Sequence, residues 1–208
     1  MTTESNRRRT LSALAFFLFA LLLFASAIAH LAGYNPRLTP TRIAVSGFLA
    51  PLVALLLAGG LVGVTQLLRD RADRTGLLGA ALSLLGWTIG ARIIALRQLQ
   101  ALSALDVPGV PADATQKLLE FAPIVFVSIV PIGLLYPIGM TILGVALFVT
   151  RPVPRWIGAS WIAGAILFPV GRAIGVIWAF NASDLLLGAA FLGAGWMILK
   201  QPRLTGAS

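Results

Sequence analysis

Two arginines stand inside long apolar stretches of this chain, where a charged side chain needs a specific partner. Arg92 lies sixteen residues beyond Gly76, and Arg172 lies sixteen residues beyond Trp156, each within an otherwise apolar run. In a helix that separation is about 24 Å. A buried guanidinium is costly unless it meets an anion, water or the membrane interface. The matched spacing therefore predicts two guanidinium groups at a similar depth.

Polar residues predicted at the same level offer these arginines partners. They are Glu120, Asp184, Asn181 and His30. One hypothesis is structural: Arg92 and Arg172 pair with Asp184 and Glu120, and the pairs lock the outer ends of the helices. The other is functional: the two guanidiniums form a site for a carboxylate or a lipid phosphate, which the planar fork of arginine binds in a bidentate way.

The residue inventory points away from an enzyme. His30 is the single histidine and the chain has no cysteine, whereas a catalytic zinc site uses three protein ligands. We predict no catalytic residue, no metal site and no cofactor. The one acid–base set that the sequence offers is His30, Glu120 and Asp184, which keeps an enzyme acting on lipid as a third hypothesis.

Composition places this chain in a membrane. Apolar residues make up 58% of it and charged residues 11%, with continuous apolar runs too long for barrel strands. The expected fold is all-α, an integral bundle of six transmembrane helices. The predicted spans are residues 11–30, 43–68, 76–100, 121–150, 156–180 and 184–200, with a basic tail at 1–10, a charged loop at 69–74, a turn at 181–184 and a second tail at 201–208.

The basic residues orient the bundle. The amino terminus, the second loop, the fourth loop and the carboxyl end are richer in Lys and Arg than the connections on the other side. By the positive-inside rule, both termini should face the cytoplasm, and we expect a multi-pass protein of the bacterial cytoplasmic membrane. The same distribution explains the net charge of +9 without nucleic acid. The first apolar run also resembles a secretory signal, with Ala25-Ser26-Ala27 as a cleavage site, although it is long for one.

The carboxyl half carries a short motif. Val153-Pro154-Arg155-Trp156 opens a Gly/Ala-rich stretch, and a last helix begins with an acidic residue and closes on a Trp-x-Ile-x-Lys pattern, here Asp184, Trp196, Ile198 and Lys200. This pattern resembles a bacterial membrane-protein family defined by a domain of unknown function, DUF4386. The family has an acidic residue after the arginine of its third helix, and here Arg92 is followed by isoleucine. The resemblance implies a fold and a membrane, and no activity.

These features favour a non-enzymatic membrane protein: a structural or interaction subunit, or a lipid-binding sensor with an outer-leaflet arginine pair. Its expected partners are membrane lipids, other membrane subunits or further copies of itself. The alternative is a small transporter or channel for an anionic or amphipathic solute, which six spans and a proline-interrupted fourth span would fit. Four aromatic residues are expected to pack the core or to line the membrane interface rather than to form a ligand cage: Tyr136, Trp161, Trp178 and Trp196.

Overall fold

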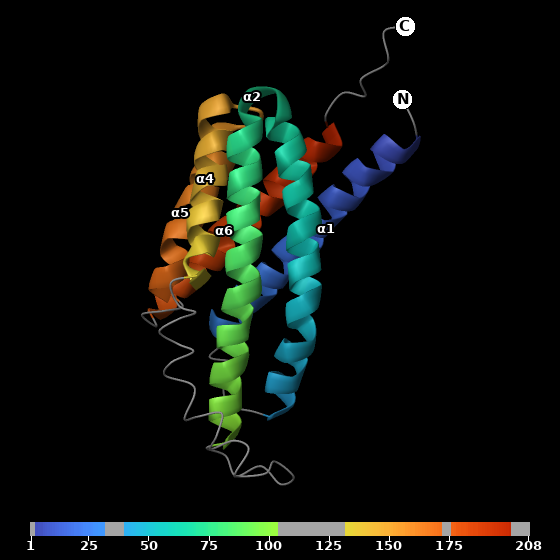
Figure 1. Ribbon diagram of the computed structural model, residues 1–208. Helices are drawn as coiled ribbons and strands as arrows, with labels where there is room; N and C mark the ends of the chain where they lie inside the picture. The colour runs from blue at the N-terminus through green and yellow to red at the C-terminus, as the bar shows by residue number, and fades with distance from the viewer. Residues whose placement is uncertain (1–2, 32–39, 104–131, 172–175, 201–208) are drawn as a thin grey trace, which may run out of the picture.

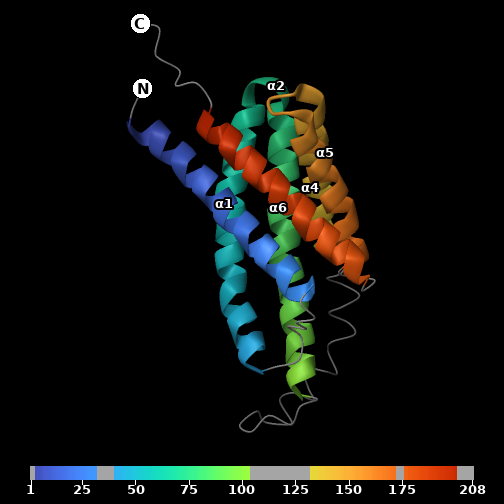
Figure 2. The same cartoon turned by 180° about the vertical axis from the view of Figure 1, so that it is seen from behind.

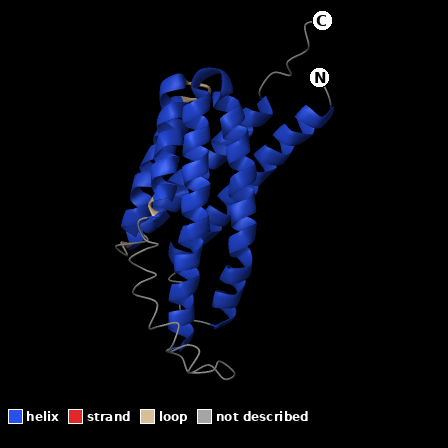
Figure 3. Ribbon diagram, viewed as in Figure 1, coloured by secondary structure: helices blue, strands red, loops and turns tan. Residues whose placement is uncertain are grey.

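The computed structural model describes residues 3–31, 40–103, 132–171 and 176–200, with side chains for 6–28, 31, 52–90, 132–171 and 176–200. Over these ranges the protein is helical and contains no strand (Figure 3). The helices are α1 (Thr3–Leu31), α2 (Pro40–Ser103), α4 (Leu135–Thr150), α5 (Arg155–Pro169) and α6 (Ile177–Lys200). The all-α prediction is therefore confirmed.

Helix α2 is two helical arms rather than one rod. Its backbone leaves the helical region at Ala72, where φ is −157° and ψ is 49°. The chain turns back there, and the two arms run side by side in opposite directions (Figure 1). Residues 69–74, which we predicted as a loop, are therefore helical except at Ala72, where the chain bends.

The helices pack in a closed ring. Contacts join α1 to α6, α6 to α5, α5 to α4, α4 to α2, and α2 back to α1. Helices α1 and α6 cross behind the α2 hairpin, as the reverse view shows (Figure 2). Inside the ring lies a core of apolar side chains, among which Phe16, Trp161 and Phe191 have no exposed surface.

The outer surface of this ring is also apolar. Leu55 on α2 is 71% exposed and Ile177 on α6 is 72% exposed. In water such a surface would be a liability, whereas lipid accommodates it. Three described stretches are long and apolar enough to cross a membrane: Asn6–Ile28, Leu52–Gly90 and Ile177–Lys200. The middle stretch contains the bend at Ala72, so it includes parts of both arms.

Several helix ends differ from the predicted span boundaries. Helix α1 begins at Thr3, so the basic tail is part of this helix from Thr3 onward. Helix α5 ends at Pro169 and α6 begins at Ile177, so residues 181–184, which we predicted as a turn, lie inside α6. Of the predicted fourth span, α4 covers Leu135–Thr150, while residues 121–131 lie outside the described part.

The connection between α4 and α5 is tight, as expected from its two prolines. Arg151 adopts a left-handed conformation with φ 54° and ψ 42°, and its N–H donates to the Leu147 carbonyl at 3.1 Å. This contact satisfies one of the free carbonyls at the end of α4. Helix α5 then begins at Arg155, so the connection spans a few residues and holds the two helices side by side.

Candidate functional site

A group of buried polar residues lies in the first two turns of α6. Asp184 and Ser183 have no exposed surface, and Asn181 is 7% exposed. Asn181 and Asp184 are three residues apart, which makes them neighbours on the helix surface. Our prediction placed these residues in a turn because Asn, Ser and Asp favour turns locally. The structure instead buries them within the bundle.

Close packing between α5 and α6 explains that burial. The Ser183 hydroxyl donates to the Gly164 carbonyl of α5 at 2.9 Å. A Cβ on Gly164 would come within 2.7 Å of Leu187 Cγ, so only glycine permits the observed approach at that point. Just beyond the end of α5, a Cβ on Gly171 would overlap the backbone of Phe180. The close contact between the two helices therefore buries the face of α6 that carries Ser183 and Asp184.

The polar atoms of this segment differ in how they are satisfied. The Asn181 Oδ1 atom is buried and accepts no hydrogen bond from the residues that the structure describes. An unsatisfied buried carbonyl costs about 1–3 kcal/mol, so this oxygen is a place where a ligand or a water would be stabilised. Asp184 differs from it, because this carboxylate takes part in an interaction of its own. The segment therefore combines a fully buried carboxylate with an available acceptor.

The other predicted site residues fall outside what the structure describes. Arg172 and Glu120 are outside the described residues altogether. Arg92 and His30 belong to α2 and α1 by their backbone, but their side chains are not described. Of the six candidates, the structure thus places two, Asn181 and Asp184, and brings them together on one helix.

A chain of aromatic rings crosses the centre of the bundle. Phe191 of α6 stacks on Phe16 at 5.1 Å and meets Trp161 edge-on at 4.7 Å, both between ring centroids. A second series runs through Trp87, Tyr136 and Phe168, with centroid separations of 5.1 and 4.7 Å. Such pairs add about 0.5–1.5 kcal/mol each beyond area burial. Tyr136 and Trp161 are thus packing residues, as predicted.

Two of the exposed tryptophans lie at the two ends of α6. Trp178 is 66% exposed near its start, and Trp196 is 53% exposed near its end. Eighteen residues separate them, which corresponds to about 27 Å along the helix. That distance is close to the thickness of a hydrocarbon core, and tryptophan is enriched at its two boundaries.

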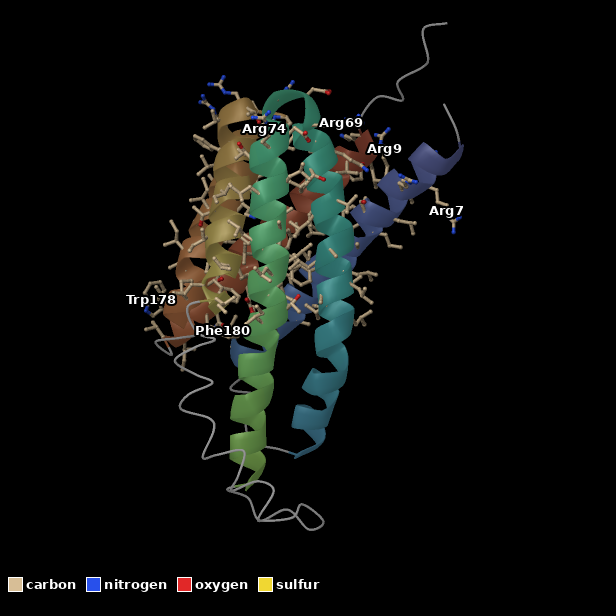
Figure 4. All side chains as sticks on the ribbon, in the orientation of Figure 1. Arg7, Arg9, Arg69, Arg74, Trp178 and Phe180 are labelled. Atoms are coloured by element: carbon tan, nitrogen blue, oxygen red, sulfur yellow. The ribbon has the colours of Figure 1, made fainter. Side chains whose placement is uncertain are left out.

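Every Lys and Arg whose side chain is described lies at one end of the bundle. Figure 4 shows four of them at the end opposite Trp178 and Phe180. The full set is Arg7, Arg8, Arg9, Arg69, Arg71, Arg74, Arg151, Arg155 and Lys200. We call this the basic end.

Two residues of the basic end bind the carboxyl ends of helices. The Arg9 guanidinium donates to the Ile198 carbonyl of α6 at 2.8 Å. The Arg71 guanidinium donates to the Thr150 carbonyl at the end of α4 at 3.1 Å. Both contacts place positive charge against the negative end of a helix dipole. They tie the amino terminus of α1 and the α2 hairpin to the rest of the bundle.

Sequence reasoning missed Ser183 and the aromatic chain as parts of this arrangement. Ser183 adjoins Asp184, but its hydroxyl donates to the Gly164 carbonyl, which lies nineteen residues away in the sequence. No protein-family model, curated protein or solved structure matches this chain.

Proposed function

We propose that this chain is a six-span protein of the bacterial cytoplasmic membrane with both ends in the cytoplasm. Helix α1, the two arms of α2, and α4, α5 and α6 would supply the spans. The basic end supports this orientation, because Lys and Arg accumulate on the cytoplasmic side. Helices α4 and α5 have 16 and 15 residues. Their crossings would therefore extend into the apolar residues that adjoin them.

Within that membrane, the protein acts as a non-catalytic structural or interaction subunit, or as a lipid-binding sensor. The full burial of Asp184 in α6 carries this proposal. Ionisable groups inside a membrane bundle are expensive and mark a pairing or a functional site. Gly171, the residue before Arg172, packs against Phe180, which lies one turn before Asp184. An ion pair between Arg172 and Asp184 would explain why a carboxylate is buried at this position.

In this proposal Arg92 supplies the second guanidinium of the outer-leaflet pair, with Glu120 as its acidic partner. If the protein is instead a lipid-binding sensor or an interaction subunit, the two arginines hold an anionic headgroup or an acidic segment of another subunit at the outer end of the bundle. Their bidentate geometry suits either ligand. The resemblance of the carboxyl half to the DUF4386 family belongs to the same proposal.

Transport of a small anionic or amphipathic solute is the second candidate. The observation that favours it is the buried Asn181 Oδ1 atom beside a buried carboxylate, since within the described part of the chain this oxygen accepts no hydrogen bond. Transporters place their substrate sites among such polar groups near the repeat or bundle interface. Uptake of labelled solutes into proteoliposomes would show this activity directly.

Arginine variants test the lead proposal. If Arg172 and Asp184 pair, Arg172→Asp should destabilise the protein, and Arg172→Asp combined with Asp184→Arg should recover part of the loss. Arg172→Lys should keep the charge and lose bidentate binding of a lipid or partner. Native mass spectrometry after extraction in mild detergent reports that binding. Equal lipid and partner binding in wild type and in Arg172→Lys would overturn the proposed arginine site.

A further inference from the structure

Positive charge is unevenly distributed over the basic end. In the α2 hairpin, Asp70 and Asp73 alternate with three arginines, so its charge is largely balanced. No acidic residue lies among residues 151–155 or in the last turn of α6, and these two stretches carry Arg151, Arg155 and Lys200. Uncompensated charge therefore lies beside the α5–α6 pair, as it also does at Arg7 on α1.

Two tryptophans lie on that same pair of helices. The ring of Trp156 passes over Gly193 of α6, where a Cβ would come within 2.7 Å of its Cη2 atom. Trp196 follows Gly193 by one turn, which makes the two positions neighbours on the surface of α6. Trp156 and Trp196 are 52% and 53% exposed, so each indole keeps about half of its surface outside the protein. Packing of Trp156 against α6 thus brings both indoles to one apolar surface.

Two cations, Arg155 and Lys200, lie near these tryptophans in the sequence, and both are exposed. Lys200 Nζ lies 4.9 Å from the centroid of the Trp196 ring, and the Arg155 guanidinium carbon lies 5.7 Å from the centroid of Phe148. Aromatic faces orient both cations without neutralising them. Arg9 already satisfies the Ile198 carbonyl, so the end of α6 does not need Lys200 for that purpose.

We propose that Arg155, Trp156, Trp196 and Lys200 form a site for the phosphate headgroup of an anionic phospholipid in the cytoplasmic leaflet. Charge complementarity selects this occupant: two uncompensated cations meet the phosphate, and two indoles lie at the glycerol level where tryptophan is enriched. The inference rests on the orientation given under Proposed function, and concerns the opposite membrane face from Arg92 and Arg172.

Quenching of tryptophan fluorescence by lipids with brominated chains tests the site in the full chain. We would reconstitute a Trp178→Phe background into zwitterionic phosphatidylcholine, so that Trp156 and Trp196 supply the exposed indoles. Brominated phosphatidylglycerol or brominated phosphatidylcholine is then titrated in. We expect the anionic lipid to quench at a lower mole fraction than the zwitterionic lipid. Each cation should contribute roughly five-fold to that preference at low ionic strength.

The decisive variant is Arg155→Gln with Lys200→Gln, and its matched control is Arg69→Gln with Arg74→Gln. Both remove two exposed arginine or lysine charges from the basic end. The first should abolish most of the preference, while the control and Arg155→Lys should retain it. Circular dichroism would verify that each variant is folded. Added salt should weaken the wild-type preference.

Two results would overturn this site. Equal losses in both double variants would mean that the whole basic end attracts lipid diffusely. Displacement of the brominated anionic lipid by inorganic phosphate, beyond that caused by chloride at equal ionic strength, would mean that the site takes free phosphate instead. Neither result bears on the number of spans or on the outer arginine pair.

Discussion

The basic end and the buried polar segment of α6 use charge in opposite ways. At the basic end, nine Lys and Arg side chains lie mostly at the surface. Two of them bind helix carbonyls, and others rest on aromatic faces. In α6, by contrast, Asp184 has no exposed surface and lies in a bundle that is apolar both inside and out.

This difference shows that an exposed charge is tolerated at many positions, whereas a buried charge needs partners at defined positions. Exposed pairs are screened by water and salt and are worth about 0–1 kcal/mol each. A buried carboxylate loses its hydration, so its partners must be positioned accurately. The basic end should therefore tolerate substitution, whereas the buried segment should not.

Removing Asp184 should have the largest effect. Asp184→Ala leaves its partner without an anion in a desolvated place, which costs about 3–5 kcal/mol when the partner is charged. Thermal unfolding in detergent would report the loss as a lower Tm. Asp73→Ala is the matched control, because that carboxylate is exposed in the hairpin and should change stability by about 0.5 kcal/mol or less. Similar Tm values for the two variants would contradict the contrast.

Two glycines on the second arm of α2 compare a tightly packed position with an open one. A Cβ on Gly86 would overlap the backbone of α4 at Tyr136, whereas a Cβ on Gly90 would meet nothing within 4 Å in the described part of the chain. Gly86→Ala should destabilise the protein by about 1–3 kcal/mol through overpacking. Gly90→Ala should be neutral or slightly stabilising, because alanine favours helix. Unfolding midpoints of the pair would decide, and a reversed order would mean that the arms pack differently.

The buried hydroxyl of Ser183 should matter less. Ser183→Ala removes the bond to the Gly164 carbonyl, and hydrogen bonds between membrane helices contribute about 1 kcal/mol. Ser160→Ala on α5 provides a comparison, since that side chain is partly exposed. Denaturation in mixed micelles measures both variants. No difference between them would show that the α5–α6 contact does not depend on this bond.

The smallest effect is expected at the basic end. Arg71→Ala removes a donor to Thr150 and should cost about 0.5 kcal/mol, decreasing as salt is added. Arg69→Ala should change stability less. The Arg69 side chain is exposed, and its position in the hairpin gives it no helix-capping role. A loss at Arg71 as large as that at Asp184 would contradict the account.

Continuous apolar runs were sufficient to predict the helices, because lipid requires every backbone group to be bonded within its segment. The α5–α6 boundary was less predictable. Asn181, Ser183 and Asp184 have turn-forming side chains, yet a carbonyl on α5 and close helix contact hold them inside α6. Whether these residues form a turn or a helix depends on a contact with residues distant in sequence, and local propensity does not include that contact. The aromatic pairing of Trp161 with Phe191 is distant in the same way.

Site-directed labelling tests the membrane orientation most directly, because the chain has no cysteine of its own. Single cysteines would replace Asp73 at the basic end and Ile177 at the start of α6, which is 72% exposed. Intact spheroplasts would then receive a membrane-impermeant maleimide. The account predicts that Ile177→Cys reacts from outside, while Asp73→Cys reacts only after permeabilisation. Labelling of both from outside, or the reverse pattern, would contradict it.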